Sequence, residues 1–161
     1  MSNISITQKD SVLDQIEQIR HRIAKRAYEL FRHRDGGFDD PVSDWLRAEE
    51  EVLWKPAVEL REKEGVFTVL AAIAGVQPKD ITVDLTARDL VIKADMAHEH
   101  STETGHVHQC EFVQGQLFRS VHFPDPVDPD KAKAEYRNGL LTVTVPAAPK
   151  AQTKPAEIKT A

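Results

Sequence analysis

The residues best suited to metal chemistry lie close together in the second half of the chain. His98, His100, His106 and His108 fall within one short stretch, and Cys110 follows two residues later. Alternate side chains of an extended strand share a face, so His106, His108 and Cys110 could converge on a metal ion. Imidazole and thiolate ligands suit zinc or copper. The alternatives are a polar loop whose histidines bind nothing, or a segment that responds to acid at about pH 6.

Catalytic arrangements find no support in the sequence. Cys110 and His108 lie too close along one strand to form a nucleophile and its base, and no Gly-x-Ser-x-Gly elbow is present. A glycine-rich lysine loop for phosphate binding is also missing. The acidic run at residues 49–51 is interpreted as solvated charge. We therefore expect neither an enzyme nor a cofactor, and only His106, His108 and Cys110 remain as weak metal candidates.

Composition indicates one globular domain. The chain has 161 residues, of which 40% are hydrophobic and 29% charged, with a net charge of −5. This charge argues against a nucleic-acid binder, because phosphate contacts need basic surface. The longest apolar run, at residues 66–76, covers only about half a bilayer, and no secretory signal is visible. A single cysteine suits a reducing compartment, so we expect a cytoplasmic protein without stable membrane insertion.

An amphipathic helix is expected over residues 11–34. Ser11 stands at its start, its last turn is basic, and two glycines follow it. A shorter helix is expected over residues 44–53, with Trp45 in its first turn. The first helix repeats apolar residues every three or four positions, namely Val12, Ile16, Ile19, Ile23, Ala27, Leu30 and Phe31.

From residue 54 the pattern changes to short strands separated by turn-forming residues. Strands of this spacing indicate an antiparallel sandwich rather than alternating strands and helices. We therefore expect an all-β domain over residues 54–146, a helical N-terminal arm over 1–53 and a flexible C-terminal tail over 147–161. The expected strands are 66–70, 81–85, a strand beginning at 90–92, 117–123 and 140–145.

Four motifs in this domain resemble those of the small heat-shock proteins. Residues 134–146, AEYRNGLLTVTVP, resemble the family signature of an alanine before Asn-Gly-Val-Leu-Thr-Val and a closing proline. Residues 71–76, AAIAGV, resemble its Ala-x-Leu-Pro-Gly-Val turn, with Ala74 in place of the proline. Residues 115–124 resemble its Gly-x-Phe-x-Arg strand, and residues 54–59 its start. The chain is identified as a member with an alpha-crystallin domain of the bacterial and plant type.

The resemblance implies an immunoglobulin-like sandwich, self-assembly and ATP-independent binding of unfolding proteins, called clients below. It also implies that clients pass to ATP-driven refolding chaperones. Two other functions stay open: an adaptor that binds one folded partner, and a metal-buffering protein built on the histidines. An adaptor would need neither the helical arm nor a strand-exchange loop.

The helical arm supplies apolar surface of the kind that a client binder must present. The alternative is a helix that packs permanently on its own sandwich as a lid. Seven basic and five acidic residues over 1–37 leave a charge of +2, which attracts anionic lipid only weakly. The expected client-binding residues are Ile16, Ile19, Ile23, Leu30, Phe31 and Trp45.

The resemblance implies a dimer in which each subunit lends a strand to the other. The polar segment 95–107 is long enough to carry it, and such loops are uncommon without a function. A disordered surface loop is the alternative. Glu111 and Arg119 are the expected dimer-interface residues, although Phe112 stands where the family often has arginine. Among apolar neighbours, Arg119 requires an acidic partner.

Larger oligomers of the family use an Ile-x-Ile hook near the C-terminus. This chain has only Ile158 there, whereas Ile4 and Ile6 form such a hook at the other end. In an extended segment both isoleucines share a face, as a groove with two pockets would require. We hypothesise that they occupy a groove formed by Val83, Leu85 and Ala134. The alternative is an inert, frayed N-terminus.

Overall fold

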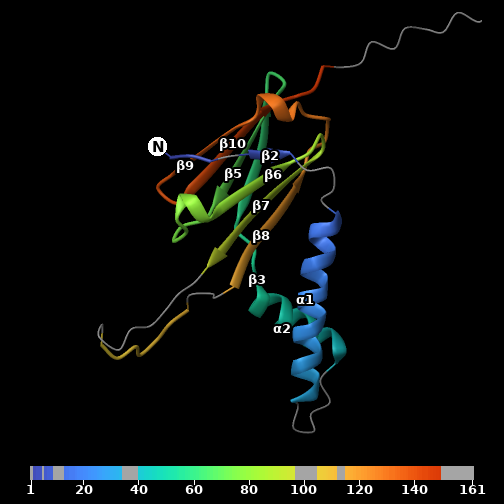
Figure 1. Ribbon diagram of the computed structural model, residues 1–161, viewed down its shortest axis with the longest axis vertical. Helices are drawn as coiled ribbons and strands as arrows, with labels where there is room; N and C mark the ends of the chain where they lie inside the picture. Colours follow the sequence, from blue (N-terminus) through green and yellow to red (C-terminus); the bar gives the residue numbers. More distant parts are fainter. Residues whose placement is uncertain are drawn as a thin grey trace, which may run out of the picture.

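The chain forms a β-sandwich with a helical hairpin beside one end, which confirms the expected fold class (Figure 1). The computed structural model describes residues 2–4, 6–8, 13–33, 40–96, 105–111 and 115–149. Two short 3₁₀ turns, Pro78–Asp80 and Pro129–Lys131, precede β6 and β9. The elements are β1 (Ser2–Asn3), β2 (Ile6–Gln8), α1 (Leu13–Arg32), α2 (Pro41–Val52), β3 (Leu53–Trp54), β4 (Val58–Lys63), β5 (Val66–Ala72), β6 (Ile81–Leu85), β7 (Asp89–Met96), β8 (Gly115–His122), β9 (Lys133–Arg137) and β10 (Leu140–Pro146).

The sandwich consists of two five-stranded sheets. One has the strand order β1-β9-β10-β5-β4, and the other has the order β2-β6-β7-β8-β3. Pairing is antiparallel except for β2 with β6 and β3 with β8, which are parallel. The short edge strands β1, β2 and β3 come from the N-terminal arm, which we had expected to be helical.

Alternating side chains build the core between the sheets. In β5, Phe67, Val69 and Ala71 are buried, and β10 alternates in the same way. The rings of Phe67 and Phe123 lie 5.5 Å apart between their centroids. Each large apolar side chain buried in this way contributes about 1.5–3 kcal/mol to folding. The strands β4 and β9 were not predicted, although both alternate between charged and apolar residues.

The turn between β9 and β10 requires its Asn-Gly sequence. Asn138 and Gly139 have φ angles of 52° and 79°, as in the two-residue turns that match the twist of a hairpin. A Cβ atom at Gly139 would lie 3.0 Å from the Cβ atom of Ala74. This position therefore lacks both the conformation and the space for a side chain.

The two helices confirm the expected amphipathic pattern with changed boundaries. α1 lies within the predicted range 11–34, whose ends fall outside the described residues. α2 begins at Pro41, earlier than predicted, because Asp40 caps it and proline fits the first helical position. Neither helix, nor any other in the described part of the chain, is long and apolar enough to cross a membrane.

The helical hairpin joins the two edges of a single sheet. α1 follows β2, which forms one edge, and α2 runs directly into β3, which forms the opposite edge. Its anchors at both ends are therefore short edge strands.

Candidate functional site

The N-terminal end of the chain contacts both sheets. β1 pairs with β9 of one sheet, and β2 pairs with β6 of the other. Between them, the backbone N–H of Ile4 donates to the carbonyl of Ala134 at 3.1 Å. We call this segment, residues 2–8, the N-terminal strap; in Figure 1 it crosses in blue between β9 and β6.

The expected hook and groove residues lie together within one chain. Val83, Leu85 and Ala134 are buried, and Ile6 is in register with Val83. Ile4 is only 8% exposed and joins the sandwich core, while Ile6 is half-buried against it. An open pocket of about 660 Å³ remains beside the strap, lined by Ile4, Ile6, Pro129, Asp130, Ala132, Lys133, Ala134 and Glu135.

Most of the expected client-binding residues lie inside the helical hairpin. Ile19 and Ile23 are 7% and 4% exposed, and Ile16, Leu30 and Trp45 are half-buried. The stripe packs within a cluster that is separate from the sandwich core. The other members of this hairpin cluster are Ala27, Ala48, Val52, Leu53 and Phe118.

The hairpin also exposes apolar side chains outside that stripe. Phe31, the remaining expected client-binding residue, is exposed and stacks on Tyr28 with ring centroids 6.4 Å apart. Val42 and Leu46 of α2 are exposed as well. Leu46 lines a pocket of about 460 Å³ at the end of α2. Apolar surface is thus accessible on the arm even while the stripe is covered.

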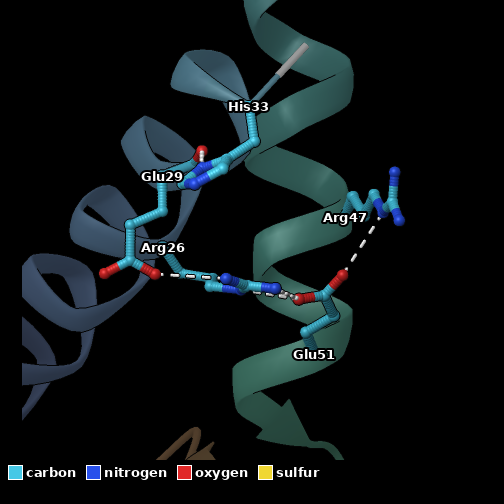
Figure 2. A network of polar contacts seen from close by, with 5 residues as sticks. All are labelled: Arg26, Glu29, His33, Arg47 and Glu51. Carbon is cyan, nitrogen blue, oxygen red and sulfur yellow. Dashed lines mark hydrogen bonds and ion pairs between the residues drawn. The ribbon is translucent and has the colours of Figure 1, made fainter. Parts of the chain in front are cut away.

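Polar contacts join the two helices beside the stripe (Figure 2). Arg26 of α1 donates to Glu51 of α2, with Nε and Nη2 both 2.7 Å from Oε2. The Nε of Arg47 lies 3.2 Å from the other oxygen of Glu51, and Arg26 Nη1 lies 3.1 Å from Glu29. The ring Nδ1 of His33 lies 2.7 Å from the carbonyl oxygen of Glu29. We call Arg26, Arg47 and Glu51 the interhelical clasp.

The clasp favours the charged state of its members. The hydrogen bond from Arg26 holds the pKa of Glu51 below its ordinary value, and the carboxylate of Glu51 raises the pKa of Arg26. Both side chains are partly exposed, so solvent and salt screen their attraction. The clasp is therefore a weak contact compared with the buried stripe.

Arg119 of β8 has an unmet hydrogen-bonding requirement. It alternates with Leu117 and Val121, which face the core. Its Nε is buried and has no hydrogen-bond partner among the described residues. The expected acidic partner is not found in that part of the chain. Glu111 is exposed and accepts a hydrogen bond from Gln109 at 2.6 Å, and Phe112 lies outside the described residues.

The edge strand β4 offers free backbone groups. The N–H of Ala72 donates to the carbonyl of Ala57, so the backbone groups of residues 58, 60 and 62 turn away from β5. No other strand of the described chain pairs with β4. Residues 105–111 of the expected exchange loop are exposed and form no strand; Figure 1 shows them in gold, away from the sheets.

The histidine segment forms no metal centre in its described part. His106, His108 and Cys110 are all exposed. Across the described residues, no three potential ligands come together. His98 and His100 lie outside those residues.

A buried ion pair on β6 and β7 was not foreseen. Asp84 is 0% exposed, and the Nζ atom of Lys93 lies 2.7 Å from its carboxylate. The alternation of β6 indicates that Asp84 faces outward, opposite Val83. Alternation defines a face of the sheet, but it carries no signal for what covers that face.

Sequence comparison relates most of the chain to one family. The sequence pattern of the Hsp20/alpha crystallin family matches residues 59–160. Heat shock protein 16 of Schizosaccharomyces pombe is 31% identical over 101 residues, covering 62% of this chain and 71% of that protein. Spore protein SP21 of Stigmatella aurantiaca is 33% identical over 99 residues, which span 62% of this chain and only 59% of that protein.

Solved structures show the same likeness. Heat shock protein 16.0 of Schizosaccharomyces pombe has a TM-score of 0.55 and 30% identity, covering 66% of this chain and 99% of its own. A small heat-shock protein of Xylella fastidiosa has a TM-score of 0.52 and 30% identity, covering 67% of this chain and 97% of its own.

Proposed function

Because the chain belongs to the Hsp20/alpha crystallin family of small heat shock chaperones, we propose that it is an ATP-independent holdase. It captures proteins that unfold under stress and keeps them from aggregating. Capture by apolar contact alone needs no nucleotide, since burial of apolar surface drives it. The client then passes to ATP-driven refolding chaperones, as the resemblance implies.

The observation that carries this proposal is the separation of two apolar clusters. The cluster around Ile19 and Ile23 belongs to the hairpin and shares no residue with the sandwich core. The helices can therefore part while the sandwich stays folded. Each large side chain of the stripe that binds a client contributes about 1.5–3 kcal/mol before ordering costs.

Client capture proceeds in two stages in this proposal. Phe31, Val42 and Leu46 are exposed already and make the first contact. Opening of the hairpin then adds Ile16, Ile19 and Ile23 to the contact surface. The net charge of −5 keeps the loaded complex dispersed.

We also propose that two copies exchange strands. The segment at residues 105–111 pairs with the free edge of β4 in the partner, because an unpaired edge accepts an added strand. Arg119 then receives a carboxylate from Glu111 of the other copy. The buried Nε of Arg119 supports this assignment, since a buried donor requires an acceptor.

Assembly beyond the dimer uses the hook residues Ile4 and Ile6 in this proposal. Their contacts with Val83 and Ala134 support it, because a neighbouring subunit presents the same groove. The protein works in the cytoplasm, where its exposed Cys110 stays reduced.

The experiment that tests the holdase measures light scattering of a heat-labile protein without nucleotide. We expect suppression at near-stoichiometric ratios by the parent chain. A variant with Ile16→Ser, Ile19→Ser, Ile23→Ser and Leu30→Ser should lose most of this suppression, because it lacks the stripe.

The control for this experiment is Leu13→Ser, which removes an exposed leucine of the same helix. It should suppress scattering like the parent chain. Unchanged suppression by the fourfold variant would place client binding outside the stripe. No suppression by the parent chain at any ratio would overturn the holdase and favour an adaptor.

A further inference from the structure

The helical hairpin is held to the sandwich at two unequal anchors. At its C-terminal end, α2 continues without a break into β3, and Leu53 is buried. A Cβ atom at Gly115 of β8 would lie 3.0 Å from the carbonyl oxygen of Val52, so the two backbones are in close contact. Lys55 also forms an ion pair with Glu49 of α2. This anchor is covalent and closely packed.

The anchor at the N-terminal end is the strap. Four residues separate Gln8 of β2 from Leu13 of α1. A chain of that length spans at most about 18 Å, so a docked strap keeps the start of α1 near the edge of β6. If the strap leaves, the hairpin remains attached only at β3.

The strap itself is short and is held mainly at two positions. β1 has two residues and β2 has three. Ile4 contributes a backbone hydrogen bond and a buried side chain, and Ile6 a half-buried one. The pocket of about 660 Å³ beside these residues leaves one flank of the strap open to an incoming segment.

We propose that the N-terminal strap is a latch for the helical hairpin, and that the strap of a second copy of this chain replaces it. A second copy offers the same backbone and the same two isoleucines to β6 and β9, so the exchanged contact is equivalent. The released hairpin is free to open around the β3 anchor. Groove occupancy by another copy and opening of the arm are then coupled, and the coupling is reciprocal.

The cis strap has the advantage of proximity. Its effective concentration is about millimolar for a short tether, so exchange needs a high local concentration of other straps. An assembled oligomer supplies that concentration. The latch therefore links assembly to exposure of the stripe, and only this last consequence rests on the proposed holdase function.

The test is hydrogen exchange of the full chain, followed by mass spectrometry. The variant Ile4→Ser with Ile6→Ser should raise the exchange rate of α1 at least tenfold, while β5 and β10 exchange as in the parent. Leu13→Ser, which changes an exposed residue next to the strap, serves as the control. Parent-like exchange of α1 in the double variant would overturn the latch.

A second measurement leaves the parent chain unaltered. The synthetic peptide MSNISITQ, residues 1–8, is added up to millimolar concentration and should accelerate exchange in α1. The same peptide with both isoleucines replaced by serine should have no effect. Equal effects of the two peptides, or none from either, would overturn replacement by a second copy. Light scattering by the parent chain is measured separately, so failure of the holdase is distinguishable from failure of the latch.

Discussion

At the scale of single residues, the sandwich depends on a few positions where no substitute fits well. Gly139 has positive φ and lies against Ala74, whereas Gly65, in the turn between β4 and β5, has positive φ and open space. Asp84 is a different kind of constraint, since its buried carboxylate needs Lys93 beside it. These positions constrain turn geometry and charge, not apolar area.

The two glycines give a matched pair for a stability prediction. Gly65→Ala should lower the free energy of unfolding by about 1–2 kcal/mol, the cost of a left-handed backbone. Gly139→Ala should lose about 1–3 kcal/mol more, because its new methyl group also crowds Ala74. Urea unfolding measures both values. Equal losses would show that the turn moves aside without cost.

At the scale of elements, the hairpin combines a buried stripe with an exposed clasp. The stripe supplies the stabilisation, since its members are removed from water. The clasp between Arg26 and Glu51 adds an electrostatic contact that solvent screens. The hairpin can therefore respond to pH and salt while the sandwich remains stable.

The clasp predicts a pH dependence of hairpin stability. The pKa of Glu51 is lowered in the folded state, so its contribution is present above the ordinary value and lost as pH falls through the folded one. Glu51→Gln should lower the melting temperature of the helical circular dichroism signal at pH 7. The difference from the parent should narrow at acidic pH and in high salt.

The control for the clasp is Glu50→Gln, which changes the exposed neighbour of Glu51. It should melt like the parent chain at pH 7. A constant difference between Glu51→Gln and the parent, from neutral to acidic pH, would contradict an ionic role for Glu51.

At the scale of the whole molecule, the open edge of β4 determines how copies meet in our proposal. Its exposed side carries charged residues, which discourage indiscriminate pairing. The backbone of residue 62 points outward from this edge, as the hydrogen bond between Ala72 and Ala57 indicates. A partner strand needs those outward groups, whereas the pairing with β5 does not.

Glu62→Pro should therefore weaken the dimer at least tenfold without loss of the fold. Proline removes the outward N–H and blocks an added strand, yet an edge strand tolerates it. Sedimentation measures the mass, and Glu62→Ala, which keeps the N–H, should sediment like the parent. A parent-like mass for Glu62→Pro would exclude exchange at this edge.

Local patterns predicted much of this molecule. The strand at residues 81–85 coincides with β6, and the amphipathic stripe lies on α1, because side-chain periodicity reports directly which face of an element is apolar. The Asn-Gly turn follows from backbone preference alone. The spacing of Ile4 and Ile6 likewise indicated an extended, one-faced segment, and the strap has that conformation.

Only the tertiary structure decided what covers each apolar face. The sequence by itself could not show that Ile4 and Ile6 contact the groove of their own chain, or that α2 covers Ile19 and Ile23. It also could not show that Asp84 is buried, or that Arg119 lacks an acceptor in the described chain. Periodicity is a property of neighbours along the chain, whereas coverage depends on residues far apart in sequence. That is why the sequence determined the elements and their faces, and the fold determined their partners.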